Sequence, residues 1–93
     1  MWPFDKAKHN GRELVAAGAT LLDVRSPGEF AGQHVEGALN IPVQQLATRV
    51  HELKGRSRSV VVYCRSGMRS RTAAELLKAQ GFDVVDIGGM GNW

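Results

Sequence analysis

This 93-residue sequence holds a single cysteine and lacks any long apolar run. The lone cysteine excludes an intrachain disulfide and a cysteine-rich zinc site. A membrane-spanning helix needs about 18 apolar residues and a secretory signal an apolar stretch of about 7–15, and the sequence shows neither pattern. We therefore expect a cytoplasmic protein with no membrane partner. A signal peptide that had already been removed would leave no trace in this sequence.

The length and composition describe one globular unit. The chain is long enough for a single domain over 1–93 and too short for a two-domain enzyme. Because 43% of the residues are hydrophobic and 23% are charged, the composition is that of a folded protein and not of a disordered one. Residues 1–9 mix aromatic, proline and charged side chains, and we expect them to form an irregular lead-in segment.

The excess of positive charge is concentrated in one place. The formal net charge is +3, and Arg65, Arg69 and Arg71 lie within seven residues of the chain, directly after Cys64. Without these three arginines, the basic and acidic residues are equal in number. A local excess of this kind indicates a small anionic ligand and not a long polyanion, so we expect no nucleic-acid partner.

Helix and strand patterns alternate along the chain. The spacing of apolar residues predicts helices over 10–17, 42–53 and 69–80, and strands over 21–24, 38–41, 59–63 and 83–87. Ser26, Pro27 and Glu29 have the spacing of a capping box with proline at the first helical position. They predict one further helical turn, which would carry Phe30 into the core. Strands separated by such helices indicate an α/β fold with a mainly parallel sheet and helices on both faces.

Cys64 follows the most apolar strand and precedes a helix. In open α/β sheets, ligands bind beyond the carboxyl ends of the strands. A loop containing Gly67 joins the strand to the helix, and its N–H groups together with the positive end of the helix would form a site for an anion. A thiol in such a site has a pKa of roughly 3.5–7.5, and its thiolate can attack an anionic substrate. The alternative is a buried, inert cysteine with solvated arginines around it.

Four ordered segments resemble the rhodanese (thiosulfate sulfurtransferase) family. The segment Cys64-Arg65-Ser66-Gly67-Met68-Arg69-Ser70 is similar to the active-site loop of that family. The other segments that match in order are 21–25 with 29–30, 34–42, and 81–85 with the glycines at 88 and 89. The resemblance covers roughly residues 10–93.

The resemblance implies a rhodanese-like three-layer sandwich and a two-step sulfurtransferase reaction. The Cys64 thiolate would take the outer sulfur of thiosulfate or a related small anionic donor as a persulfide. A thiol or cyanide acceptor, or a protein that accepts sulfur, would then remove it. The loop N–H groups would hold the persulfide, and Arg65 and Arg69 would bind the sulfonate. The implied substrate-binding residues are Arg65, Ser66, Gly67, Met68, Arg69 and Ser70, and no metal or organic cofactor is implied.

Two other functions remain open from the sequence. Related dual-specificity phosphatases have one residue more in the loop, so the six residues from Cys64 to Arg69 favour a sulfur atom over a phosphate. The small size and the short ends are also compatible with a noncatalytic or regulatory rhodanese-like module that docks on a partner protein and delivers sulfur.

Three further residues are assigned supporting roles: Asp23, Arg25 and Arg71. Asp23 and Arg25 end a strand near Cys64, and they either tune the charge of the loop or serve the fold through an ion pair between Arg25 and Glu29. We favour the ion pair, because such pairs are common at the edges of active sites. Asn40 is expected to bond backbone groups before Pro42. A second basic cluster is expected to be a solvated loop; its members are Lys54, Arg56 and Arg58.

Overall fold

The computed structural model describes residues 11–93, so Asn10, at which the first predicted helix begins, and the lead-in segment 1–9 lie outside the described residues. The elements in chain order are α1 (Gly11–Ala16), β1 (Thr20–Asp23), α2 (Pro27–Gly32), β2 (Leu39–Asn40), η1 (Val43–Gln45), α3 (Leu46–Arg49), α4 (His51–Lys54), β3 (Ser59–Cys64), α5 (Met68–Ala79), β4 (Asp83–Gly89) and η2 (Met90–Asn92). The strands form one sheet of order β2-β1-β3-β4, and every pair is parallel. The predicted parallel α/β architecture is therefore confirmed.

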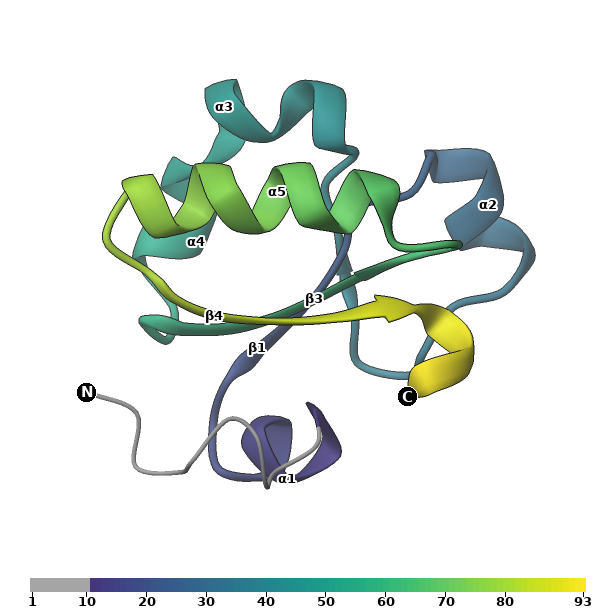
Figure 1. Cartoon of the computed structure of the whole chain (residues 1–93), viewed down its shortest axis with the longest axis horizontal. Helices are drawn as coiled ribbons and strands as arrows, with labels where there is room; N and C mark the ends of the chain where they lie inside the picture. Colours follow the sequence, from purple (N-terminus) through teal and green to yellow (C-terminus); the bar gives the residue numbers. More distant parts are fainter. Residues whose placement is uncertain (1–10) are drawn as a thin grey trace.

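Helices cover both faces of the sheet, as Figure 1 shows with α3, α4 and α5 on one side and α1 on the other. The alternation of side chains along β3 divides the core between these faces. Val60, Val62 and Cys64 belong to the larger apolar cluster, and Val61 and Tyr63 belong to the smaller one. Both faces of β3 are covered, which explains why its sequence is continuously apolar.

The sequence predicts one continuous helix over 42–53, and this prediction is wrong. This segment forms the 3₁₀ turn η1 and the short helices α3 and α4, with hydrogen bonds of the i→i+3 type from Gln45 to Pro42 and from Leu53 to Val50. These tighter turns bend the segment. Leu46 and Leu53, which carried the expected apolar spacing, are both fully buried.

The predicted turn after Ser26 is α2, and both bonds of its capping box are present. Phe30 does not reach the core, which corrects the expectation. It is half-buried, and its ring stacks on that of His34 with 3.7 Å between centroids. The reason is the position of α2, which lies at the rim beyond the strand ends and buries none of its residues (Figure 1).

The last strand is longer than the sequence predicts, since β4 continues to Gly89. A register shift between Val62 and Tyr63 of β3 places Gly88 opposite Tyr63 and Gly89 opposite Cys64. The end of β4 therefore lies beside the loop that follows Cys64.

Candidate active site

The sulfur of Cys64 lies at the carboxyl end of the central strand β3, within a short loop. Cys64 is fully buried, and α5 begins only four residues later at Met68. Gly67 closes the loop with a left-handed backbone (φ 107°), a conformation that favours glycine. Its N–H points into the loop and donates a hydrogen bond to Sγ of Cys64 at 2.9 Å. The predicted cradle of backbone donors around the sulfur is thus present in the structure.

The surroundings of Cys64 favour the thiolate. Burial by itself raises the pKa of the thiol, because it disfavours the charged form. The Ser70 side chain and the backbone N–H groups of Ser70, Gly67 and Ser66 act in the opposite direction and outweigh burial. The pKa of Cys64 consequently lies below its usual value, although the sulfur is enclosed by protein.

Ser70 is the side chain that contacts the sulfur directly. It is fully buried in the first turn of α5, with its Oγ 3.5 Å from Sγ of Cys64. In the thiol form, Sγ donates to Oγ and the Ser70 hydroxyl donates to the carbonyl of Gly67 at 3.2 Å. When the thiol ionises, the hydroxyl can turn its proton toward the sulfur. Ser70 can therefore accept from the thiol and donate to the thiolate.

Gly89 permits the end of β4 to pass directly under the loop. A Cβ atom at this position would lie 2.6 Å from the backbone carbonyl oxygen of Arg65. That atom belongs to the main chain of the loop, so it cannot move aside as the tip of a flexible side chain would. Glycine at position 89 is therefore required by the shape of the loop around Cys64.

We expect the substitution Gly89→Ala to lower the rate constant for alkylation of the Cys64 thiol at least tenfold, or about 1.4 kcal/mol of activation free energy. The added methyl group displaces the Arg65 carbonyl and with it the N–H groups that face the sulfur. The measurement is the second-order rate of reaction with iodoacetamide, followed by intact mass. Gly55→Ala is the matched control, because a Cβ at Gly55 meets no atom within 4 Å. Equal rates in the two variants would contradict this role of Gly89.

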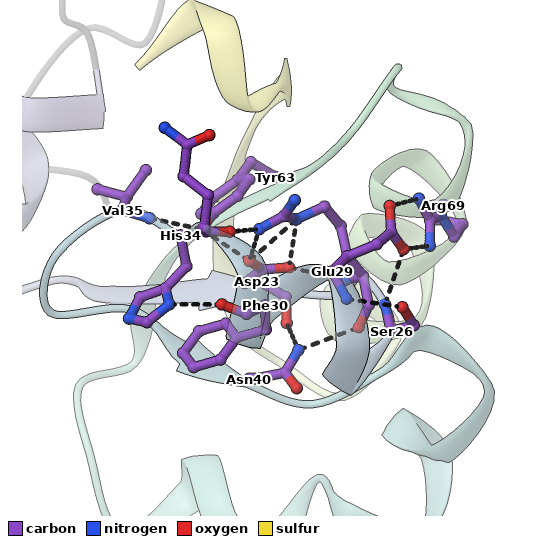
Figure 2. A network of polar contacts seen from close by, with 11 residues as sticks. Asp23, Ser26, Glu29, Phe30, His34, Val35, Asn40, Tyr63 and Arg69 are labelled. Carbon is purple, nitrogen blue, oxygen red and sulfur yellow. Dashed lines mark hydrogen bonds and ion pairs between the residues drawn. The ribbon is translucent and has the colours of Figure 1, made fainter.

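Arg69 is held by an acidic residue of α2. Its guanidinium makes two hydrogen bonds with the carboxylate of Glu29, at 2.6 and 3.0 Å (Figure 2). Arg69 and then the backbone N–H of Ser26 lower the pKa of Glu29 to about 2, so the pair stays ionised across the physiological range. Glu29 thus serves two elements at once: it completes the capping box of α2 and fixes the first turn of α5.

The expected ion pair between Arg25 and Glu29 is wrong, because Arg25 pairs with Asp23. The two side chains bond through several atoms, the shortest contact being 2.9 Å from Nη2 to Oδ2. Both are buried, with 0% and 5% of Asp23 and Arg25 exposed. An arginine so buried needs a carboxylate in direct contact, and the carboxylate of Glu29 is already engaged by Arg69.

Tyr63 extends this buried pair to the strand that carries Cys64. Its hydroxyl donates to Oδ2 of Asp23 at 2.8 Å and accepts from the N–H of Val35 (Figure 2). Burial, reinforced by the Asp23 carboxylate, raises the pKa of Tyr63 to about 12 and keeps the hydroxyl protonated. Asn40 bonds the carbonyl oxygens of Asp23 and Arg25, as predicted for the turn before Pro42. These contacts align the ends of β1 and β3.

The remaining predicted residues surround the mouth of the loop. Arg65, Ser66, Met68 and Arg71 are exposed, and Gly67 is half-buried. An open hollow of about 470 Å³ borders the loop at Arg65 and reaches α2 and η2. Its lining residues are Arg25, Gly28, Glu29, Gly32, Gln33, Arg65, Met90 and Gly91. The structure therefore brings Cys64, Gly67 and Ser70 into one contact network, pairs Arg69 with Glu29, and leaves the Arg71 side chain outside both sets of contacts.

The second basic cluster lies at the other end of the sheet, before β3 begins. Lys54, Arg56 and Arg58 line a hollow of about 220 Å³ near the carboxyl ends of α4 and α5. Arg58 donates to the carbonyl of Gly81 and lies 3.7 Å from the carboxylate of Asp83. Cations are favourable beside the free carbonyl groups that end a helix, so this cluster has a structural explanation.

Residues 11–93 contain neither a cluster of metal-ligand side chains nor a membrane-spanning helix. No group of three or more His, Cys, Asp and Glu side chains lies close enough together to hold a metal ion. No helix in this part of the chain is both long and apolar enough to span a membrane.

Two contacts of the loop could not be foreseen from the sequence. The Arg69–Glu29 pair joins residues 40 positions apart, and no local pattern indicates it. The approach of Gly89 to Arg65 also escaped prediction, although a glycine pair at the end of a strand is a known sign of a close backbone approach.

Comparison with known proteins gives consistent results over most of the chain. A family model described as a rhodanese-like domain matches residues 6–93. The thiosulfate sulfurtransferase PspE of Escherichia coli is 35% identical over 69 residues, which cover 73% of this chain and 66% of PspE. The protein YqhL of Bacillus subtilis is 40% identical over 77 residues, which cover 81% of this chain and 60% of YqhL. The chain thus spans less than two thirds of the length of these curated relatives.

Solved structures agree with the fold described above. A rhodanese with anions from E. coli has a TM-score of 0.73 at 32% identity, covering 81% of this chain and 91% of that one. A human single-domain sulfurtransferase has a TM-score of 0.69 at 28% identity, covering 88% of this chain and 84% of that one. The three-layer α/β fold expected from the sequence is thereby confirmed.

Proposed function

The chain belongs to the rhodanese-like family, and on this premise we propose that it is a thiosulfate sulfurtransferase that works through a persulfide on Cys64. The observation that carries the proposal is the hydrogen bond of 2.9 Å from the N–H of Gly67 to Sγ of Cys64. It belongs to a set of donors that lowers the pKa of the thiol, and a thiolate is the form of cysteine that attacks sulfur.

In the first step, the Cys64 thiolate attacks the outer sulfur of thiosulfate. A bond forms between Sγ and this sulfur, the sulfur–sulfur bond of thiosulfate breaks, and its electron pair leaves with sulfite. The product is a persulfide anion on Cys64. The backbone N–H groups of Ser66, Gly67 and Ser70 favour the thiolate. In the proposal they also stabilise the negative charge on the outer sulfur of the persulfide, one atom beyond Sγ.

Arg65 and Arg69 have different roles in the proposed reaction. Arg69 is engaged by Glu29, so in our proposal it holds the loop against α2. Arg65 is exposed at the edge of the hollow, and no hydrogen bond or ion pair of its guanidinium occurs within the described chain. Arg65 is therefore placed to bind the sulfonate group through charge-assisted hydrogen bonds.

In the second step, an acceptor thiolate or cyanide attacks the outer sulfur of the persulfide. The bond between that sulfur and Sγ breaks, and the electron pair returns to Cys64 as the thiolate. Two displacements on one nucleophile predict ping-pong kinetics. The relatives named as thiosulfate sulfurtransferases and the similar E. coli rhodanese with anions support a donor of this charge.

The proposal is tested by weighing the intact protein after treatment with thiosulfate. We expect a gain of one sulfur atom, which cyanide then removes with the formation of thiocyanate. Protein alkylated at Cys64 beforehand serves as the control and should gain nothing. If the untreated thiol reacts readily with iodoacetamide but takes up no sulfur from thiosulfate, the assignment of this donor is overturned.

A further inference from the structure

The surface around the mouth of the loop has an unusual composition. Among residues 11–93, Met68 is the only large hydrophobic side chain that is exposed, with 80% of its surface accessible. Arg65 precedes it by three residues and Arg71 follows it by three, and both arginines are exposed. We call Arg65, Met68 and Arg71 the Met68 rim.

The arginines of the Met68 rim are available for an external partner. Arg69 is neutralised by Glu29, whereas no hydrogen bond or ion pair of the Arg65 or Arg71 guanidinium is present in the described part of the chain. Met68 and Arg71 lie three residues apart on α5, so they share one face of the helix. Glu75, one turn further, forms no ion pair with Arg71 in residues 11–93.

Fold stability does not explain this arrangement. Arg71 stands outside the network that holds Cys64, and an exposed methionine adds little to the core. Methionine and arginine are, however, enriched in protein interfaces, where an apolar centre is surrounded by polar contacts. The rim also carries two of the three arginines that account for the net charge of the chain.

From these observations we infer that the acceptor which collects sulfur from Cys64 is a thiol on an acidic polypeptide segment that docks on the Met68 rim. The inference rests on the proposed function, since it concerns the second step of that reaction. Positive charge at the rim would raise the local concentration of an acidic partner. Met68 would pack against an apolar side chain beside the acceptor cysteine.

The charge of the reacting groups gives a chemical reason for placing the acceptor at the Met68 rim. The acceptor thiolate attacks the outer sulfur of the Cys64 persulfide, which is also an anion. A new sulfur–sulfur bond forms on the acceptor, the bond to Sγ breaks, and its electron pair remains on Cys64. Two anions must therefore approach each other, and the unpaired arginines of the rim reduce that repulsion.

The experiment uses the full chain, loaded with sulfur from thiosulfate and checked by intact mass. Three cysteine peptides that differ only in acidic, neutral or basic flanking residues act as acceptors, and each rate is expressed per thiolate from the measured thiol pKa. We expect the acidic peptide to react at least tenfold faster than the basic one at about 0.01 M salt. The preference should vanish at about 1 M salt, where the screening length falls from about 30 Å to about 3 Å.

Variants identify the surface that is responsible. The substitution Arg71→Glu should lower the rate for the acidic peptide, divided by the rate for cyanide in the same variant, at least tenfold. Met68→Ser should lower this ratio about threefold. Arg56→Glu makes the same charge change at the opposite end of the sheet and should leave the ratio unchanged.

Each outcome supports or overturns a separate claim. Failure to load sulfur overturns the proposed function itself. Normal loading with equal rates for the three peptides, or an effect of Arg56→Glu as large as that of Arg71→Glu, overturns the docking surface alone. If the amino acid cysteine, used as a small acceptor, reacts as fast as the acidic peptide, the docking surface is overturned as well.

Discussion

The variant Cys64→Ser should take up no sulfur from thiosulfate and form no thiocyanate. A serine hydroxyl at this position would retain the backbone donors, but it ionises far less readily than a thiol. A serine nucleophile requires an adjacent general base. The contacts of Sγ within the described residues are backbone N–H groups and the Ser70 hydroxyl, and none of them can act as that base at neutral pH. Intact mass after thiosulfate treatment measures the result.

The fold should tolerate this change, because the hydroxyl of serine can keep the bonds to Gly67 and Ser70. Ser66→Ala is the control, since Ser66 is exposed in the same loop and its side chain does not contact the sulfur. Sulfur uptake by a correctly folded Cys64→Ser protein would show that the nucleophile lies elsewhere.

In the wild type, the rate of sulfur uptake from thiosulfate should rise with pH. It should level off below the usual thiol pKa of about 8.5.

The variant Asp23→Ala should lose about 3–5 kcal/mol of the free energy of unfolding. The change leaves the Arg25 guanidinium buried without its carboxylate and the Tyr63 hydroxyl without its acceptor. An unpaired buried charge costs far more than an exposed one. Urea denaturation measures the loss, and a domain of this size has little stability to spare.

Glu52→Ala is the matched control for Asp23→Ala. Glu52 also pairs with an arginine, Arg49, at 2.7 Å, but both side chains are about one third exposed. Removal of such a surface pair should cost less than about 1 kcal/mol. Losses of similar size in the two variants would mean that the buried pair contributes no more than a surface pair.

The order of elements and the position of Cys64 between a strand and a helix could be predicted from the sequence. The apolar β-branched run over 59–63 indicates a central strand, and the glycine after Cys64 indicates a turn that faces its N–H groups inward. Both are local signals, because they depend on backbone geometry over a few residues. The capping box of α2 is of the same kind, and it was predicted correctly.

The partners of the charged residues could not be predicted in this way. Arg25 has acidic neighbours on both sides along the chain, and the sequence favoured Glu29, four residues away. The choice depends on burial and on long-range pairing, because Arg25 and Asp23 are buried together while Glu29 pairs with Arg69 of α5. Similarly, the close approach of Gly89 to Arg65 depends on a register shift in the sheet. The spacing of apolar residues along the sequence does not indicate this shift.

The position of Glu29 has a consequence for local unfolding. The helix α2 buries none of its residues, so packing contributes little to its stability. One carboxylate completes its cap and also binds Arg69 at the start of α5. We therefore expect fraying of α2 to free Arg69 at the start of α5, next to the loop that holds Cys64. If the two segments open together in this way, hydrogen exchange in α2 reports on the order of the loop around Cys64.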